Sequence, residues 1–285
     1  MELARIAFYQ TMVMLVIILI GGICYKKEVI TSQTSQKLSD ILVKVVNPMV
    51  IFVSFQMEFN VKVLKGLATV FVLACVAHVM GIVFARFFAR DQVEAWTMTY
   101  SNCGFMGIPL IQALLGAEGV VYLAAYIAVF NLVAWTHGIS LMSGEKQQNV
   151  KSLLKLPTII ALILGFLAFM LRIRLPEILV EPLDRVGSMN TPLAMLIAGV
   201  TIAQSDFMSA LKNIRSYFVV ACKLLIVPGI FAAVFSFFPI AYMPYVTAVM
   251  ATACPTAALG TILAVRYHRG EEKASQLFTI STALS

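Results

Sequence analysis

The sequence predicts an all-α polytopic membrane protein with ten transmembrane helices. Of its 285 residues, 60% are hydrophobic and only 12% are charged, whereas soluble domains carry roughly 25% charged residues. The mean hydropathy is +0.91, and several apolar runs approach the roughly 20 residues that cross a bilayer core. So few charged side chains cannot cover a soluble globule of this length.

Ten candidate spans follow one another along the chain. The first is too long for the apolar region of a signal peptide and has no clear cleavage site, so we expect it to be retained. The last, "SQLFTISTALS", makes only about four turns of helix, and we expect a truncation there. The predicted spans are 7–25, 41–57, 65–89, 95–115, 119–142, 156–172, 189–205, 215–238, 243–266 and 273–285.

The lysines and arginines predict the orientation of these spans. With the N-terminus outside, fourteen of the 21 fall in inner loops, six fall in outer segments, and Lys223 lies inside a span. Cytoplasmic loops carry an excess of such residues, so both termini should be extracytoplasmic, in a plasma or inner cell membrane. The same loops account for the net charge of +7, and we expect no nucleic-acid partner.

The two halves of the chain contain similar sequence segments in the same order. "VVNPMVIFVSF" corresponds to "SMNTPLAMLIAGV", "FVLAC" to "FVVAC", and "YSNCGFMGIPL" to "ATACPTAALGTIL", in the same order. Because each half has an odd number of spans, the halves must insert with opposite orientation. We therefore expect a first inverted repeat over 1–142, a cytoplasmic linker over 143–155 and a second inverted repeat over 156–285.

Spans four and nine are interrupted at matching positions. Gly104 and Gly107 permit unwound backbone in one, and Pro255 removes an N–H group in the other. Unwound backbone at membrane depth survives only inside protein or beside a wet cavity. Two half-helix N-termini near mid-membrane would favour an anion. For either segment alone, close packing by small residues is the alternative.

Three motifs carry a resemblance to the auxin efflux carrier family, which includes plant PIN-type auxin exporters and bacterial permeases for malate and malonate. They are "NPMVIF", "SNCGFMGIPL" and "ACPTAALGTILA". The resemblance runs over nearly the whole chain and implies two inverted five-helix repeats with crossed, unwound helices 4 and 9, as in bile-acid symporters and sodium/proton antiporters. It also implies homodimers formed through scaffold helices. The short linker is typical of a compact prokaryotic member.

The resemblance places the substrate site at the crossing helices. Plant exporters carry a proline and then a substrate-contacting asparagine in the fourth helix; Ser101 and Asn102 occupy these positions here. Ser101 either only accommodates the break or contributes a ligand. Asn47 and Asn190 are second-tier candidates, with helix capping as the alternative. The predicted substrate-binding residues are Asn102, Ser101, Cys103, Gly104, Pro255, Thr256, Asn47 and Asn190.

Two titratable residues inside spans are further candidates. Lys223 either attracts the anion, pairs with a protonatable group or extends its side chain to the cytoplasmic surface. His78 either relays protons or is a buried structural histidine. No Asp or Glu sits clearly inside a span, which disfavours carboxylate-based coupling to H⁺ or Na⁺.

We expect a lipid-embedded secondary carrier for small organic anions, mono- or dicarboxylates, that works by alternating access. A sodium- or proton-coupled symporter or exchanger is one rival, and a transporter-like membrane sensor without net flux is another. The sequence shows no nucleotide loop, catalytic triad or metal cluster, so we expect no enzyme activity, cofactor or metal. The cysteines have no metal-ligand spacing; they are Cys24, Cys75, Cys103, Cys222 and Cys254.

Overall fold

The computed structural model describes residues 2–145, 154–204 and 213–285, and every named element in these ranges is a helix. Five segments are long and apolar enough to cross a membrane, which agrees with the all-α membrane class. Most of the predicted linker, with Lys146 and Lys151, lies outside the described residues, and so does Lys212. The five segments are Phe8–Lys26, Val61–Phe88, Cys103–Ser143, Glu177–Gln204 and Ile214–Ser236.

The described elements fall on either side of the predicted linker. Those before it are α1 (Glu2–Lys26), α2 (Ser32–Ile41), η1 (Leu42–Val46), α3 (Asn47–Ser54), α4 (Val61–Phe88), α5 (Gln92–Thr99), η2 (Cys103–Gly107), α6 (Ile108–Val133), η3 (Ala134–Gly138) and α7 (Ile139–Ser143). Those after it are α9 (Pro157–Met170), α10 (Glu177–Gly187), α11 (Asn190–Gln204), α13 (Ile214–Ala221), η4 (Cys222–Ile226), α14 (Val227–Ser236), α15 (Tyr242–Ala253), α16 (Leu259–Tyr267) and α17 (Glu271–Leu284).

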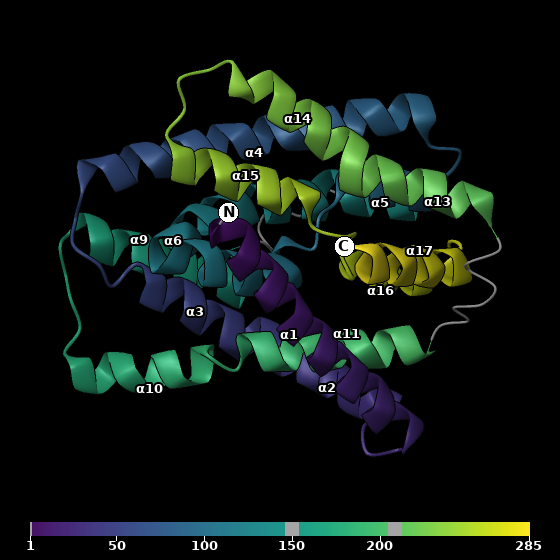
Figure 1. The fold of residues 1–285 in the computed structure, drawn as a ribbon, viewed down its shortest axis with the longest axis horizontal. Coiled ribbons are helices and arrows are strands. Elements are labelled where there is room, and N and C mark those ends of the chain that lie inside the picture. Colours follow the sequence, from purple (N-terminus) through teal and green to yellow (C-terminus); the bar gives the residue numbers. More distant parts are fainter. Residues whose placement is uncertain (1, 146–153, 205–212) are drawn as a thin grey trace.

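Two groups of helices enclose the middle of the molecule (Figure 1). In this view α4, α13, α14 and α15 lie at the top, α2, α10 and α11 lie at the bottom, and α1 runs from the middle to the lower right. The crossing of α1 and α11 is very close because it is lined by glycine. A Cβ atom at Gly21 would collide with the backbone of Leu196, and one at Gly199 with the carbonyl of Ile18.

Three short π-helical turns, η1, η2 and η4, each end one residue before an X-Pro pair. The prolines are Pro48, Pro109 and Pro228. A proline inside a helix lacks an N–H donor and clashes with the carbonyl four residues earlier. A wider turn shifts that carbonyl and lets it accept from another N–H donor, which is how membrane helices tolerate proline.

This local geometry corrects the interpretation of Asn47 as a helix cap. Helical structure runs without interruption from Ser32 to Ser54, and Asn47 lies in its middle with αR backbone angles. The helix begins well before the predicted start at residue 41, because the Thr31 side chain caps it by accepting a hydrogen bond from Thr34 N–H at 3.2 Å.

A bend divides the 41-residue helical stretch Cys103–Ser143. Gly116 has φ 66° and ψ −160° inside α6, and a Cβ atom at this position would meet nothing within 4 Å. The constraint is therefore backbone conformation, which glycine alone tolerates readily. The bend falls in the "GAEG" turn, where the predicted spans 95–115 and 119–142 meet.

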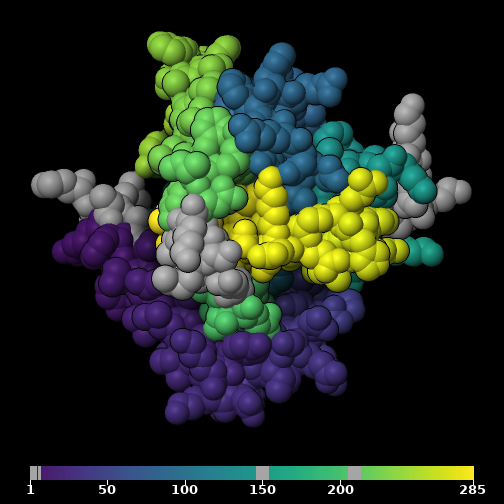
Figure 2. Space-filling view, turned by 90° about the vertical axis from the view of Figure 1, so that its right-hand side faces the viewer, coloured from purple at the N-terminus to yellow at the C-terminus, as the bar shows by residue number. Residues whose placement is uncertain are grey.

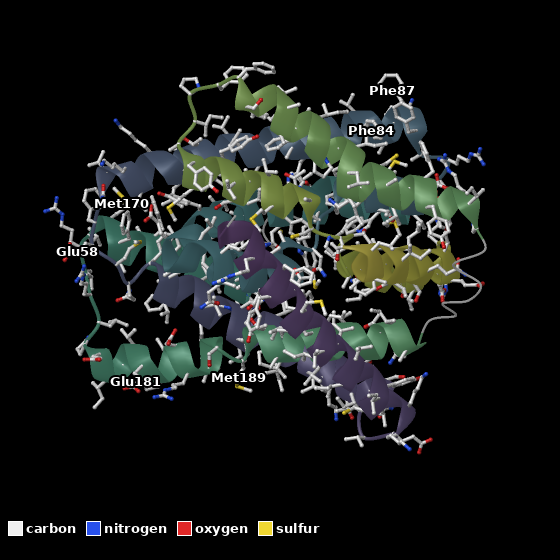
Figure 3. The ribbon with its side chains drawn as sticks, viewed as in Figure 1. Glu58, Phe84, Phe87, Met170, Glu181 and Met189 are labelled. Atoms are coloured by element: carbon white, nitrogen blue, oxygen red, sulfur yellow. The ribbon has the colours of Figure 1, made fainter. Side chains whose placement is uncertain are left out.

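Segments distant in sequence reach the same end of the molecule. The labelled residues Glu58, Met170 and Glu181 all lie toward the left of Figure 3, and an ion pair of 3.4 Å joins Arg174 to Glu58. Along the sides, apolar side chains point outward, as Phe87 of α4 does with 77% of its surface exposed (Figure 3). Such a surface suits lipid contact.

A charged cluster ties α5, α13 and α17 together just before predicted span 95–115. The Glu94 carboxylate, fully buried, pairs with Arg215 at 2.6 Å and Lys273 at 2.6 Å, and Lys273 also pairs with Asp91 at 2.5 Å. Burial alone would raise the pKa of Glu94, but the hydrogen bonds from Arg215 and Lys273 lower it to about 2. The Glu94 carboxylate therefore stays ionised at neutral pH, and its ion pairs fix three helices to one another.

Candidate functional site

The two broken helices meet at an isolated antiparallel bridge between Ser101 and Thr256. α5 ends just before one of these residues, and α15 ends just before the other. The backbone N–H of Asn102 donates to the carbonyl of Pro255 at 2.7 Å. Two extended backbone segments that are distant in sequence thus hydrogen-bond to each other. This pairing satisfies backbone N–H and C=O groups that lack intrahelical partners at the breaks.

Aromatic side chains support this bridge from one side. The N–H of Ala257 donates to the carbonyl of Tyr100 at 2.9 Å, and Trp96 Nε1 donates to the carbonyl of Ala257 at 3.4 Å. The rings of Trp96 and Tyr100 lie 4.2 Å apart between centroids. Gly260 must be small, because a Cβ atom there would overlap the Trp96 ring.

A cavity of about 760 Å³ lies beside the bridge. Four of the predicted site residues line it, namely Asn47, Ser101, Asn102 and Gly104. Its walls also include Gln204 and Glu271, which are exposed at the surface, so the cavity leads outward from the broken helices. Figure 2 views this end of the molecule, where α16 and α17 (yellow) lie above the N-terminal helices (purple).

Two helix N-termini begin at the cavity wall. Met106 N–H bonds to the carbonyl of Asn102 at 3.0 Å, so the N–H groups of 103–105 lie in the first turn of η2, before its first backbone hydrogen bond. In the same way Gly260 N–H bonds to the carbonyl of Ala257 at 3.0 Å at the start of α16. The first N–H groups of a helix have no intrahelical acceptor and carry partial positive charge.

Two asparagines supply polar groups to the wall. The side chain of Asn102, 6% exposed, makes no capping hydrogen bond to η2. Asn190 Nδ2 donates to Asn47 Oδ1 at 2.5 Å, which joins α3 to α11. Asn47 Nδ2 would lie 3.8 Å from a Cβ atom built at Gly104. The structure therefore brings Asn47, Asn190 and the broken fourth helix together.

The side chain of Lys223 is buried behind the bridge and does not reach the surface, so the alternative of a surface-directed lysine is wrong. Its exposed fraction is 1%. Nζ donates to Ser101 Oγ, and to the carbonyl of Thr252 at 3.0 Å. The Ser101 hydroxyl in turn donates to the same Thr252 carbonyl at 3.0 Å.

The contact of the Thr252 carbonyl with Lys223 is a feature of the break that the sequence alone does not reveal. In a regular helix its carbonyl would accept from Thr256 N–H, but that N–H donates to Ser281 Oγ at 3.3 Å instead. The break at Pro255 thus frees the Thr252 carbonyl for Lys223. The available signal is the position of the proline, which removes the donor of the carbonyl four residues before it and so marks where the helix can break.

Cys103, Pro255 and Thr256 belong to the bridge region but do not line the large cavity. Cys103 is fully buried, and Thr256 Oγ1 is a buried oxygen without a hydrogen-bond partner. In the structure these three residues belong to the broken backbone segments and do not contribute to the wall of the large cavity.

The geometry of His78 is that of a packed histidine. Its Nδ1 bonds to the carbonyl of Ala74 at 2.7 Å, and its ring lies 5.4 Å from that of Tyr126. It does not line the cavity. Among the residues that the structure describes, no group of three or more His, Cys, Asp or Glu could hold a metal ion.

Apolar spans around a cavity that lies beside two paired helix breaks fit a membrane transporter. The chain belongs to the membrane transport protein family, whose model matches residues 6–153 and 146–285. It is 24% identical over 283 residues to an "Uncharacterized transporter" of Methanothermobacter thermautotrophicus, covering 95% of this chain and 92% of the relative. It is 26% identical over 238 residues to a "Putative malonate transporter" of Rhizobium meliloti, covering 78% of this chain and 73% of the relative.

Proposed function

We propose that this transporter carries small organic anions, mono- or dicarboxylates, by alternating access around the cavity at Asn102. The observation that supports this most strongly is the start of two helices, η2 and α16, at one cavity wall. The partial positive charge of these helix starts suits a carboxylate. The name of the Rhizobium relative, which refers to malonate, agrees with this substrate class.

The proposal assigns a direct contact to Asn102. Its amide lines the cavity and has no capping bond, so its two N–H donors are available to a carboxylate oxygen. Ser101 and Gly104 form the adjacent wall, and Asn47, held by Asn190, closes it from the opposite helix. The remaining predicted residues are assigned to maintaining the non-helical backbone at the breaks. They are Cys103, Pro255 and Thr256.

The proposed architecture is a ten-span inverted repeat over 1–142 and 156–285, with both termini extracytoplasmic in a cell membrane. In this orientation the surface opening of the cavity at Gln204 and Glu271 faces the cytoplasm. α1 packs on α11 and α3 on α9, while α4 packs on α6 and α13 on α17. We assign the first group to a scaffold and the second to a part that moves relative to it during transport.

Flux into liposomes tests the proposal. The purified full chain, reconstituted without other proteins, should show saturable uptake of malonate, malate or lactate. Asn102→Ala should lower the initial rate by about tenfold or more, since a hydrogen bond to a charged group contributes roughly 1.5–3 kcal/mol. Gln276→Ala is the matched control, because this amide bonds to Glu272 at 3.0 Å and does not line the cavity.

Two results would contradict the assignment. One is the absence of saturable uptake for every carboxylate tried, and the other is wild-type flux from the Asn102 variant. Sodium and pH gradients imposed on the same liposomes separate a uniporter from a coupled symporter or exchanger, because only a coupled carrier accumulates substrate against its gradient.

A further inference from the structure

Lys223 is a buried cation without a counter-ion in the part of the chain that the structure describes. None of the ion pairs found there includes it. Two other partly buried cations do have a counter-ion, since Arg215 and Lys273 both form ion pairs with Glu94. A buried charge is costly unless it is paired, so the missing anion requires an explanation.

Neutral oxygens hold the ammonium group in place. Lys223 donates to the carbonyl of Thr252 and to the hydroxyl oxygen of Ser101. These hydrogen bonds orient the group, but they do not cancel its charge. In a medium of low dielectric constant the field of an uncancelled charge extends well beyond its contacts.

Ser101 connects this ammonium to the cavity. The residue contacts Lys223 on one side and lines the cavity on the other. Its own proton is directed to the Thr252 carbonyl, which leaves the hydroxyl oxygen to accept from Lys223. The Ser101 hydroxyl therefore cannot donate its proton to a bound anion. Instead, it holds the Lys223 ammonium group next to the part of the cavity where an anion would bind.

We propose that Lys223 is the fixed counter-charge of the transported anion and that Ser101 is its positioning residue. This inference rests on the proposed function. It makes the negative charge of the substrate a requirement for selection: an uncharged molecule of the same shape leaves the ammonium uncompensated. A proline at position 101 would lack the acceptor oxygen, so the serine at the break has a specific role.

The test compares carboxylates with their uncharged amides. Binding of malonate and malonamide, and of lactate and lactamide, is measured by calorimetry on the purified full chain. The wild type should bind the charged member of a pair at least about tenfold more tightly, given the strength of charge attraction at low dielectric. Lys223→Met should bring this ratio close to one, and Lys223→Arg should keep much of it.

Variants of the neighbouring residues separate charge compensation from a merely structural role. Ser101→Ala should lower the ratio while retaining part of it, because the cation remains but loses an acceptor. Asn102→Ala should weaken carboxylate binding through a lost contact, yet leave a preference for the charged ligand. Lys62→Met, at the start of α4 outside the cavity, should match the wild type.

The possible failures are distinguishable. If the wild type binds none of these carboxylates, the proposed function is wrong and this inference with it. If the wild type binds them and Lys223→Met keeps the full charge preference, only the role of Lys223 is overturned. Should Lys223→Met not fold, Ser101→Ala and Lys223→Gln decide the matter: an unchanged ratio in either folded variant contradicts the inference.

Discussion

Individual backbone groups at Pro255 explain how the broken helix is maintained. The proline has no N–H to give to the carbonyl of Ala251, and the next N–H, that of Thr256, is bound to Ser281. The carbonyl of Thr252 is then free to accept from Lys223. A single residue thus creates both the break and the acceptor that holds a buried lysine.

Pro255→Ala should favour regular helix over the break. An alanine supplies the missing N–H and removes the clash with the preceding turn, an effect worth roughly 3 kcal/mol in a helix interior. We expect thermal stability to stay level or rise, while malonate uptake falls by about tenfold or more, as in other sites where strain serves function. Pro239→Ala, in an exposed loop, is the control. Wild-type uptake in Pro255→Ala would show that the break is dispensable.

The Asn47–Asn190 hydrogen bond predicts coupled effects on stability. Replacing either residue with alanine leaves a buried amide unsatisfied, which costs about 1–3 kcal/mol. The double variant should cost less than the sum of the two single variants, by at least about 0.5 kcal/mol, because the partners are lost together. Urea unfolding of the four proteins in one detergent measures this. Strict additivity would mean that the two side chains do not interact.

At the scale of helices, the Glu94 cluster makes α5, α13 and α17 one unit. Three helices that are far apart in sequence share one buried carboxylate, with Arg215 also donating to the carbonyl of Phe88 at 2.5 Å. α5 leads directly into the bridge at Ser101. The position of the broken helix is therefore tied to the charges around the start of α5.

Glu94→Gln should destabilise the protein and make its stability depend less on pH in the acid range. Removing one partner of a buried ion pair costs about 3–5 kcal/mol. The pKa of Glu94 is lowered to about 2 from an ordinary value of 4.5, so the unfolded chain binds the proton first. Its contribution to stability is present above pH 4.5 and is lost as the pH falls toward 2.

Melting temperatures between pH 7 and pH 2 check this prediction. The wild type should lose stability progressively below pH 4.5, and the Glu94→Gln variant should lose less over the same interval. Glu181→Gln is the control, since Glu181 is an exposed residue paired within its own helix. Equal acid slopes for the wild type and Glu94→Gln would contradict the role given to this carboxylate.

For the whole molecule, the sequence predicts the class of fold and the positions of the breaks better than it predicts contacts. Composition and run length suffice for an all-helical membrane protein, because a bilayer imposes both. Gly104 and Pro255 mark the breaks since their effects are local to the backbone. The family match also agrees with the motifs around them.

The contacts across the site depend on tertiary structure, and the local sequence pattern does not predict them. Lys223 and Thr252 lie 29 positions apart and meet only because the helix break frees a carbonyl. Asn47 has the sequence context of a helix start, yet the π-helical turn before Pro48 lets the helix continue through it. Glu94 lies at the edge of a predicted span, and its partners come from the opposite half of the chain.

Counterflow of labelled malonate tests the central claim most directly. Liposomes containing the purified protein are loaded with unlabelled malonate and diluted into a trace of labelled malonate without any ion gradient. A carrier with alternating access should accumulate label transiently above equilibrium, and Asn102→Ala should abolish this overshoot. Binding of malonate without an overshoot in the wild type would instead identify a membrane sensor and contradict the account of transport.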